Sequence, residues 1–170
     1  MLGGTTVREM AEVLLRPAVE VELVELSALA LRSKGYWGYD ADLLEACRQE
    51  LTITPDRLAR EVITVATDGL GGATLGYSAL ALDQPTAGLA DLFVEPVAIG
   101  SGVGALLLAR AQSDARAAGA CSLRIEADPY AAAWYRRRGA RDIGTVPSGS
   151  IAGRVLPLLE IDLGETDRTE

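Results

Sequence analysis

The sequence predicts one α/β domain of the α+β type, in which a mixed central sheet carries helices on both faces. Three observations predict this. Apolar residues follow a helical spacing over 22–50 and then a strand-like alternation over 61–82. Residues 89–127 form one strand–helix–strand unit, which a right-handed crossover makes parallel. A chain of 170 residues that is 49% hydrophobic suits a single domain with a sizeable core.

The N-terminal half supplies helices first and a hairpin second. Asp40 suits the N-cap of the second helix, and Gly76 suits a bulge in the second hairpin arm. The elements expected here are a strand over 12–16 that stops at Pro17, helices over 22–32 and 41–50, and strands over 61–67 and 73–82.

The C-terminal half contains the crossover and the last strands. Asp128 and Pro129 suit the N-cap and first turn of a helix, and Pro157 favours an edge position for the last strand. The elements expected here are strands over 89–95, 121–127, 141–146 and 155–163, and helices over 103–118 and 130–138. We expect one domain over 1–170, with a folded core over 7–163, a frayed start at 1–6 and a polar tail over 164–170.

Composition excludes several classes of function. The net charge of −8 argues against nucleic acid binding, which needs clustered Lys and Arg. The chain has no His and no Cys/His/carboxylate cluster, so we expect no metal, and Cys47 and Cys121 suit small core positions. We find no signal peptide and no apolar run that could span a bilayer, so a cytoplasmic protein without a membrane partner is expected.

The most informative segment is a glycine loop between a strand and a helix, with Gly100, Gly102 and Gly104 on alternate positions. Glycines permit a tight turn with positive φ, and the helix N-terminus adds positive potential to the converging N–H groups. A diphosphate-bearing cofactor fits such a loop. Residues 100–105 also satisfy the dinucleotide pattern G-x-G-x-x-A, with Glu126 about 20 residues later. A dinucleotide fold would need a series of crossovers, and only one is expected here.

Two motifs resemble those of the GCN5-related N-acetyltransferases (GNAT). The first is Val94-Glu95-Pro96 followed by residues 99–107, and the second covers residues 128–140. The chain departs from the family pattern at four positions. Ile99 replaces Gln or Arg, Asp128 replaces Asn, and Trp134 and Ala140 replace two Phe residues.

The resemblance implies acetyl-CoA as the co-substrate and an amine as the acceptor, which attacks directly through a tetrahedral intermediate. Tyr135 would be the general acid to the leaving thiolate. Asp128 stands beside the cofactor in the motif, although we favour its role as an N-cap. The positions that the resemblance assigns to the cofactor are Leu92, Phe93 and Val94 for pantetheine, Gly100, Ser101, Gly102, Val103, Gly104 and Ala105 for pyrophosphate, and Asp128.

The acceptor side is less defined. Tyr36, Trp37 and Tyr39 lie where the family builds the acceptor wall, and they suit either cation–π contact with an amine or packing on the second helix. Glu126, Glu95 and Asp91 are candidate bases, directly or through water, and the spacing does not choose among them. The acceptor could be a small molecule or a peptide, and monomer and homodimer both stay open. A non-catalytic acyl-CoA-binding module is the alternative function.

Overall fold

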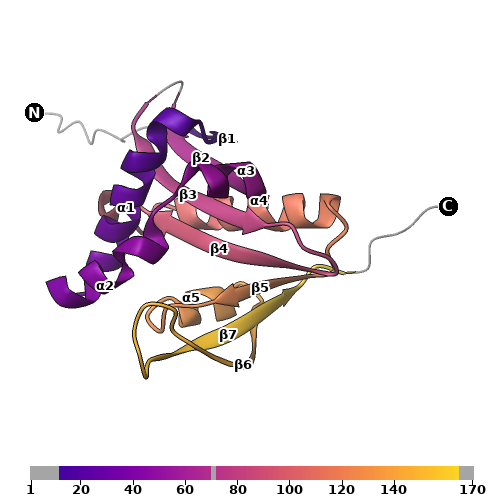
Figure 1. Ribbon diagram of the computed structural model, residues 1–170. Coiled ribbons are helices and arrows are strands. Elements are labelled where there is room, and N and C mark those ends of the chain that lie inside the picture. Colours follow the sequence, from indigo (N-terminus) through magenta and orange to yellow (C-terminus); the bar gives the residue numbers. More distant parts are fainter. Residues whose placement is uncertain (1–11, 70–71, 165–170) are drawn as a thin grey trace, which may run out of the picture.

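A seven-stranded mixed sheet forms the centre of the molecule, with strand order β1-β2-β3-β4-β5-β7-β6 (Figure 1). The computed structural model describes residues 12–69 and 72–164. The segments expected to be frayed or polar at 1–6 and 165–170 therefore lie outside the described residues, as does the start of the expected core at 7–11.

The elements follow the predicted order, with one additional α-helix and two short 3-10 helices. The strands are β1 (Val13–Pro17), β2 (Glu61–Asp68), β3 (Thr74–Ala81), β4 (Thr86–Val94), β5 (Ser122–Glu126), β6 (Arg141–Pro147) and β7 (Val155–Asp162). The helices are α1 (Leu23–Gly35), α2 (Ala41–Leu51), α3 (Pro55–Arg60), α4 (Val103–Ala117) and α5 (Ala132–Arg136), with 3-10 turns η1 (Glu20–Glu22) and η2 (Pro96–Ala98).

Helices cover both faces of the sheet, as the sequence predicts. Leu26 and Leu29 of α1 pack with Val65 and Tyr77 on one face. Successive strand residues point to opposite faces, and Ala66 accordingly packs with Val103 and Leu107 of α4 on the other face. The residues of α5 join the core that α4 forms with β5 and β7. The sheet is thus the middle of three layers.

The central feature of the sheet is a short parallel junction between β4 and β5. Pairing runs only over Thr86–Leu89 and Ser122–Ile125. β4 continues to Val94, and the register with β3 shifts at Ala79/Leu80, which leaves Ala90 without a partner. The two strands therefore diverge beyond Leu89, and the edge of β4 that faces β5 is open from Ala90 onward (Figure 1).

Five details differ from the sequence-based expectations. Cys121, expected at a core position, is exposed, whereas Cys47 is buried. Helix α3 was not predicted, although Thr54 caps it and Pro55 occupies its first turn. Strand β7 is not an edge strand, because it lies between β5 and β6 in the sheet. Its Pro157 is tolerated because the pairing with β5 ends at Leu158. The bulge expected at Gly76 falls next to it, where Leu75 lacks a partner. Helix α5 is shorter than predicted and begins at Ala132.

None of the helices within the described ranges combines the length and apolar character needed to cross a membrane.

Candidate active site

A cavity of about 980 Å³ opens where β4 and β5 diverge. It is lined by the open part of β4, the glycine loop, the start of α5, the end of α1 and the loop between β6 and β7. The cavity therefore reaches both faces of the sheet, because α1 and α4 lie on opposite faces.

The open edge of β4 presents backbone groups to this cavity. Glu95 N donates to Leu75 O on the β3 side, so the alternation of a strand turns the amides of Leu92 and Val94 toward the open side. The Val94 amide donates to Ser33 Oγ at 3.3 Å. The backbone of Leu92 thus remains available to a guest that extends along the strand. Leu92, Phe93 and Val94, which the sequence assigns to the cofactor, all line the cavity.

The glycine loop curls into the N-terminus of α4 as expected. Gly100 and Gly102 have φ values of +84° and +91°, and Gly102 is the N-cap of α4. Gly104 has no positive φ; it is required for packing instead, because a Cβ there would lie 3.3 Å from the Trp134 ring. Of the six loop residues assigned to the cofactor, Gly100, Gly102, Gly104 and Ala105 line the cavity. Val103 points into the core, and Ser101 Oγ donates to Ala98 O at 2.5 Å.

Tyr135 is a core residue whose hydroxyl reaches the cavity. Its side chain is 6% exposed and lines the cavity. No described residue forms a hydrogen bond with the Tyr135 hydroxyl. Every fully buried side-chain oxygen or nitrogen in the described part of the chain has a partner, so this hydroxyl is not fully buried. The hydroxyl is therefore accessible. Burial raises the pKa of Tyr135 above its ordinary value, so the phenol keeps its proton at neutral pH.

Trp134 and Arg138 form a neighbouring wall of the cavity. The Trp134 ring lies against Gly104, and the Arg138 guanidinium stacks on that ring at 3.8 Å from its centroid. Both residues line the cavity. Arg138 brings a positive charge to a loop that has no Lys or Arg of its own.

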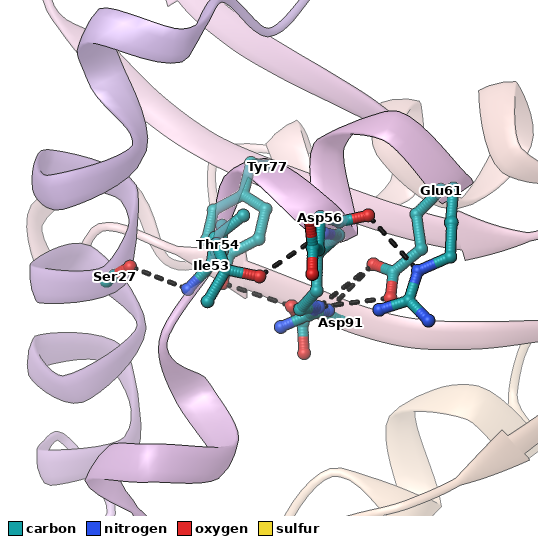
Figure 2. A network of polar contacts seen from close by, with 9 residues as sticks. Ser27, Ile53, Thr54, Asp56, Glu61, Tyr77 and Asp91 are labelled. Atoms are coloured by element: carbon teal, nitrogen blue, oxygen red, sulfur yellow. Dashed lines mark hydrogen bonds and ion pairs between the residues drawn. The ribbon is translucent and has the colours of Figure 1, made fainter.

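On the other face, two carboxylates share one arginine in an acid-rich cluster (Figure 2). Arg57 of α3 donates to Asp91 Oδ2 at 2.7 Å and to Glu61 Oε2 at 2.8 Å. Tyr77 Oη donates to the same Asp91 oxygen at 3.4 Å. Burial raises the pKa of Asp91, and the charge of Arg57 opposes that shift. Asp91 Oδ1 receives no hydrogen bond from the described residues and is not fully buried, and Asp91 lines the cavity.

The structure separates the three candidate bases by position. Asp91 and Glu126 line the cavity, and Glu126 forms no ion pair with any described residue. Glu95 does not line it, because its carboxylate is bound by Arg32. Glu95 is therefore not placed to reach a substrate in the cavity.

Beyond the acid-rich cluster, two cations share one carboxylate in a base-rich cluster. Lys34 Nζ lies 3.1 Å and Arg154 Nη2 3.6 Å from Asp128 Oδ2. Tyr39 Oη donates to Asp128 at 2.9 Å and receives a hydrogen bond from Arg154 at 2.5 Å. Asp128 is thus not the N-cap of α5, which is Ala131; its Oδ1 accepts the Tyr130 amide in a turn before that helix.

The aromatic residues of the α1–α2 loop pack against one another and against Tyr130. Trp37 stacks on Tyr130 with a centroid distance of 5.8 Å, and Tyr39 meets the same ring edge-on. Only Trp37 of the three predicted acceptor contacts lines the cavity. Tyr36 is exposed, and Tyr39 is engaged by Asp128 and Arg154.

Sequence reasoning missed the charged residues Lys34, Arg57 and Arg154. The pattern Thr54-Pro55-Asp56 signals a helix start and could have located α3 and with it Arg57. No local signal marks Lys34 or Arg154, because their partner Asp128 is distant in the sequence.

A family model described as "Acetyltransferase (GNAT) domain" matches residues 59–139, from the end of α3 through α5. That range contains the first motif, the second motif up to Gly139, the diverging strands and the glycine loop. Over these residues the chain matches the acetyltransferase domain of the GNAT family. No curated protein matches the sequence.

Solved structures share the GNAT fold along most of the chain. A GCN5-related N-acetyltransferase from Rhodopseudomonas palustris aligns with a TM-score of 0.74 and 23% identity, over 90% of this chain and 97% of that one. The PaiA N-acetyltransferase from Thermoplasma acidophilum, solved with coenzyme A, gives 0.74 and 18% over 89% and 99%. YncA from Salmonella typhimurium, solved with acetyl-CoA, gives 0.62 and 18% over 91% and 95%.

Proposed function

We propose that this GNAT domain transfers an acetyl group from acetyl-CoA to an amine by direct attack of the amine on the thioester. The observation that carries this proposal is the divergence of β4 from β5 after Leu89. It leaves one cavity that contains an unpaired strand edge, the N-terminus of α4, the Tyr135 hydroxyl and an accessible carboxylate.

The residues present fit acetyl-CoA, which when bound supplies the acetyl thioester. Leu92 offers backbone groups along the open edge, where an extended amide chain would pair as an added strand. The glycine loop offers N–H groups at a helix N-terminus, which suits a pyrophosphate. Arg138, held over Trp134, adds a cation beside that loop.

Asp91 is the best-placed base among the described carboxylates. It lines the cavity, and its raised pKa brings it closer to the value at which a carboxylate accepts a proton effectively near neutral pH. Arg57 and Tyr77 hold Oδ2 and fix the orientation of the carboxylate. Glu126 is the alternative, since it also lines the cavity.

Tyr135 is placed to give a proton to the departing thiolate. Burial keeps the phenol protonated, and its hydroxyl is free to donate into the cavity. Its backbone is fixed in α5, whose residues pack in the core with α4 and β7. The acid and the base thus come from α5 and β4, on the two sides of the divergence.

The test measures thiol release from acetyl-CoA by purified protein against a panel of amines and peptides. Acetylated product should appear with at least one acceptor class, and competition of CoA against nicotinamide dinucleotides in a thermal-shift assay should favour CoA. CoA binding without acetyl transfer to any acceptor would instead indicate a non-catalytic acyl-CoA-binding module. Preference for the dinucleotide would refute the assignment of the glycine loop.

A further inference from the structure

The base-rich cluster formed by Lys34, Tyr39, Asp128 and Arg154 has more positive charge than its own residues neutralise. Lys34 and Arg154 share the single carboxylate of Asp128. Burial and the contact with Asp128 raise the pKa of Tyr39 to about 12, so this phenol is neutral at pH 7. The cluster therefore carries one surplus positive charge.

This surplus charge is largely enclosed and faces the cavity. The side chains of Lys34, Asp128 and Arg154 are only 14%, 18% and 18% exposed, and all three line the cavity. Enclosed charges are poorly screened by salt and solvent, so an unpaired one favours a counter-ion strongly. Glu50 also lines the cavity, but its carboxylate accepts a hydrogen bond from Ser150 and forms no ion pair with either cation.

Donor groups remain available on both cations. An ammonium has three N–H donors and a guanidinium has five. Lys34 uses one on Asp128, and Arg154 uses one on Tyr39 within the described residues. Lys34, in the last turn of α1, and Arg154, in the loop between β6 and β7, both line this cavity.

The acid-rich cluster has the opposite balance. Asp91 and Glu61 share Arg57, so this cluster carries one surplus negative charge. The cavity therefore has an excess of negative charge beside the proposed base and an excess of positive charge at the loops. A guest that matches both is a small zwitterion, with an ammonium group at one end and an anionic group at the other.

We infer that the acceptor is an amine that also carries a carboxylate, such as an amino acid, and that Lys34 and Arg154 bind this carboxylate. The inference rests on the proposed acetyl transfer to an amine. A carboxylate is favoured over a phosphate because it carries one charge, which equals the surplus, and because an arginine fork matches its two oxygens.

The cluster is not placed to serve the cofactor pyrophosphate. Lys34 lies at the end of α1, which packs on the face of the sheet opposite to α4 and its glycine loop. The two anion-binding positions are therefore separated by β4.

The test compares amino acids with their carboxamides and with the corresponding decarboxylated amines as acceptors. The wild-type kcat/KM for the preferred amino acid should exceed that of its carboxamide by about tenfold or more, the effect expected for a charge-assisted hydrogen bond. Lys34→Gln and Arg154→Gln should each reduce this ratio, mainly through the acceptor KM, and leave the affinity for CoA unchanged. Arg48→Gln is the matched control, because Arg48 is exposed on α2 and pairs with Glu45 outside the cavity.

Two outcomes overturn the whole inference while the proposed function stands, and a third overturns the choice of carboxylate. One is acetylation of carboxamides or decarboxylated amines as fast as amino acids by the wild type, which needs no variant to fold. The other is an unchanged preference in both folded variants, which would make the cluster a purely structural link between loops. A higher kcat/KM for an amine that carries a phosphate would also overturn the choice of carboxylate. Absence of thiol release with every acceptor would instead contradict the proposed function itself.

Discussion

The two sides of the cavity differ in the groups that line them, which are backbone on one side and charged side chains on the other. The α4 side consists of backbone: the open edge of β4 and the glycine loop, with Arg138 as its added charge. The opposite side consists of ionic side chains, in one cluster of two acids with a base and another of two bases with an acid. The backbone-built side suits the cofactor, and the side built from ionic side chains suits a specific acceptor. Four substitutions test this contrast, and each should affect only one side or the chemistry between them.

The largest effect is expected for Asp91→Asn, which removes the proposed base and keeps its shape. We expect kcat to fall by roughly 10²–10⁴-fold with the affinity for CoA unchanged. Only the ionised carboxylate accepts a proton, and burial raises the pKa of Asp91. The wild-type rate should therefore fall as the pH is lowered through that raised pKa, and this limb of the pH–rate profile should be absent in the variant.

Glu95→Gln is the matched control for this change, because Glu95 lies at the end of the same strand but is bound by Arg32 outside the cavity. It should retain nearly the wild-type kcat. If Asp91→Asn also retained the wild-type kcat and its acidic limb, Glu126 or water would have to be the base.

Tyr135→Phe removes the phenolic hydroxyl that is proposed to protonate the departing thiolate. We expect kcat to fall by up to about 10²–10⁴-fold, or somewhat less because a thiolate can leave unaided. The protonated phenol is the active form and its pKa is raised, so the basic limb of the pH–rate profile should lie high and should shift or vanish in the variant. Tyr130→Phe, at an exposed tyrosine before α5, is the control. An unchanged rate and profile with the true acceptor would refute the assignment.

Gly102→Val tests the backbone-built side. A side chain at φ +91° is strained by roughly 1–2 kcal/mol, although no atom lies within 4 Å of the added Cβ. We expect the loop to leave its conformation and the affinity for CoA to fall about tenfold or more in calorimetric titration, with the fold retained. Gly69→Val carries a similar backbone penalty at φ +66° in a distant hairpin and should bind CoA normally. Wild-type affinity in a folded Gly102→Val variant would disprove the position of the cofactor.

Trp37→Ala should have the smallest effect and should act on the acceptor side alone. The exposed face of an aromatic ring contributes about 0.5–1 kcal/mol to binding a cation, which corresponds to a several-fold rise in the acceptor KM. Tyr36→Ala is the natural comparison, since Tyr36 neighbours Trp37 but does not line the cavity. A large loss of affinity for acetyl-CoA with an unchanged acceptor KM would reverse the assignment of the two sides.

The same contrast explains how far the sequence could be interpreted. The glycine loop and the strand before it are contiguous, and their glycines and apolar alternation are direct consequences of the backbone they form. The order of the elements along the chain and the parallel crossover were predicted for the same reason. The charged clusters were not, because Lys34 comes from the last turn of α1 and Asp128 and Arg154 come from two loops far from it in the chain.

Local preference also gave wrong boundaries where a tertiary contact competes with it. Asp128 is a residue type typical of an N-cap, but Lys34 and Tyr39 bind its carboxylate, and α5 starts four residues later. Pro157 suggested an edge strand, but the neighbouring strand β5 ends before it. Each residue meets its local rule in part, and the deciding partner lies elsewhere in the sequence.

The short parallel junction between β4 and β5 fixes the angle at which the two strands diverge along the site. Only residues 86–89 and 122–125 join the two halves of the sheet there, and β4 extends five residues further, over 90–94. At about 3.3 Å per residue, that arm is about 16 Å long. A rotation of about 5° at the junction would therefore move the tip of the arm by about 1.4 Å, nearly the length of a carbon–carbon bond. The width available to a substrate is thus set by the angle between the two strands at this junction.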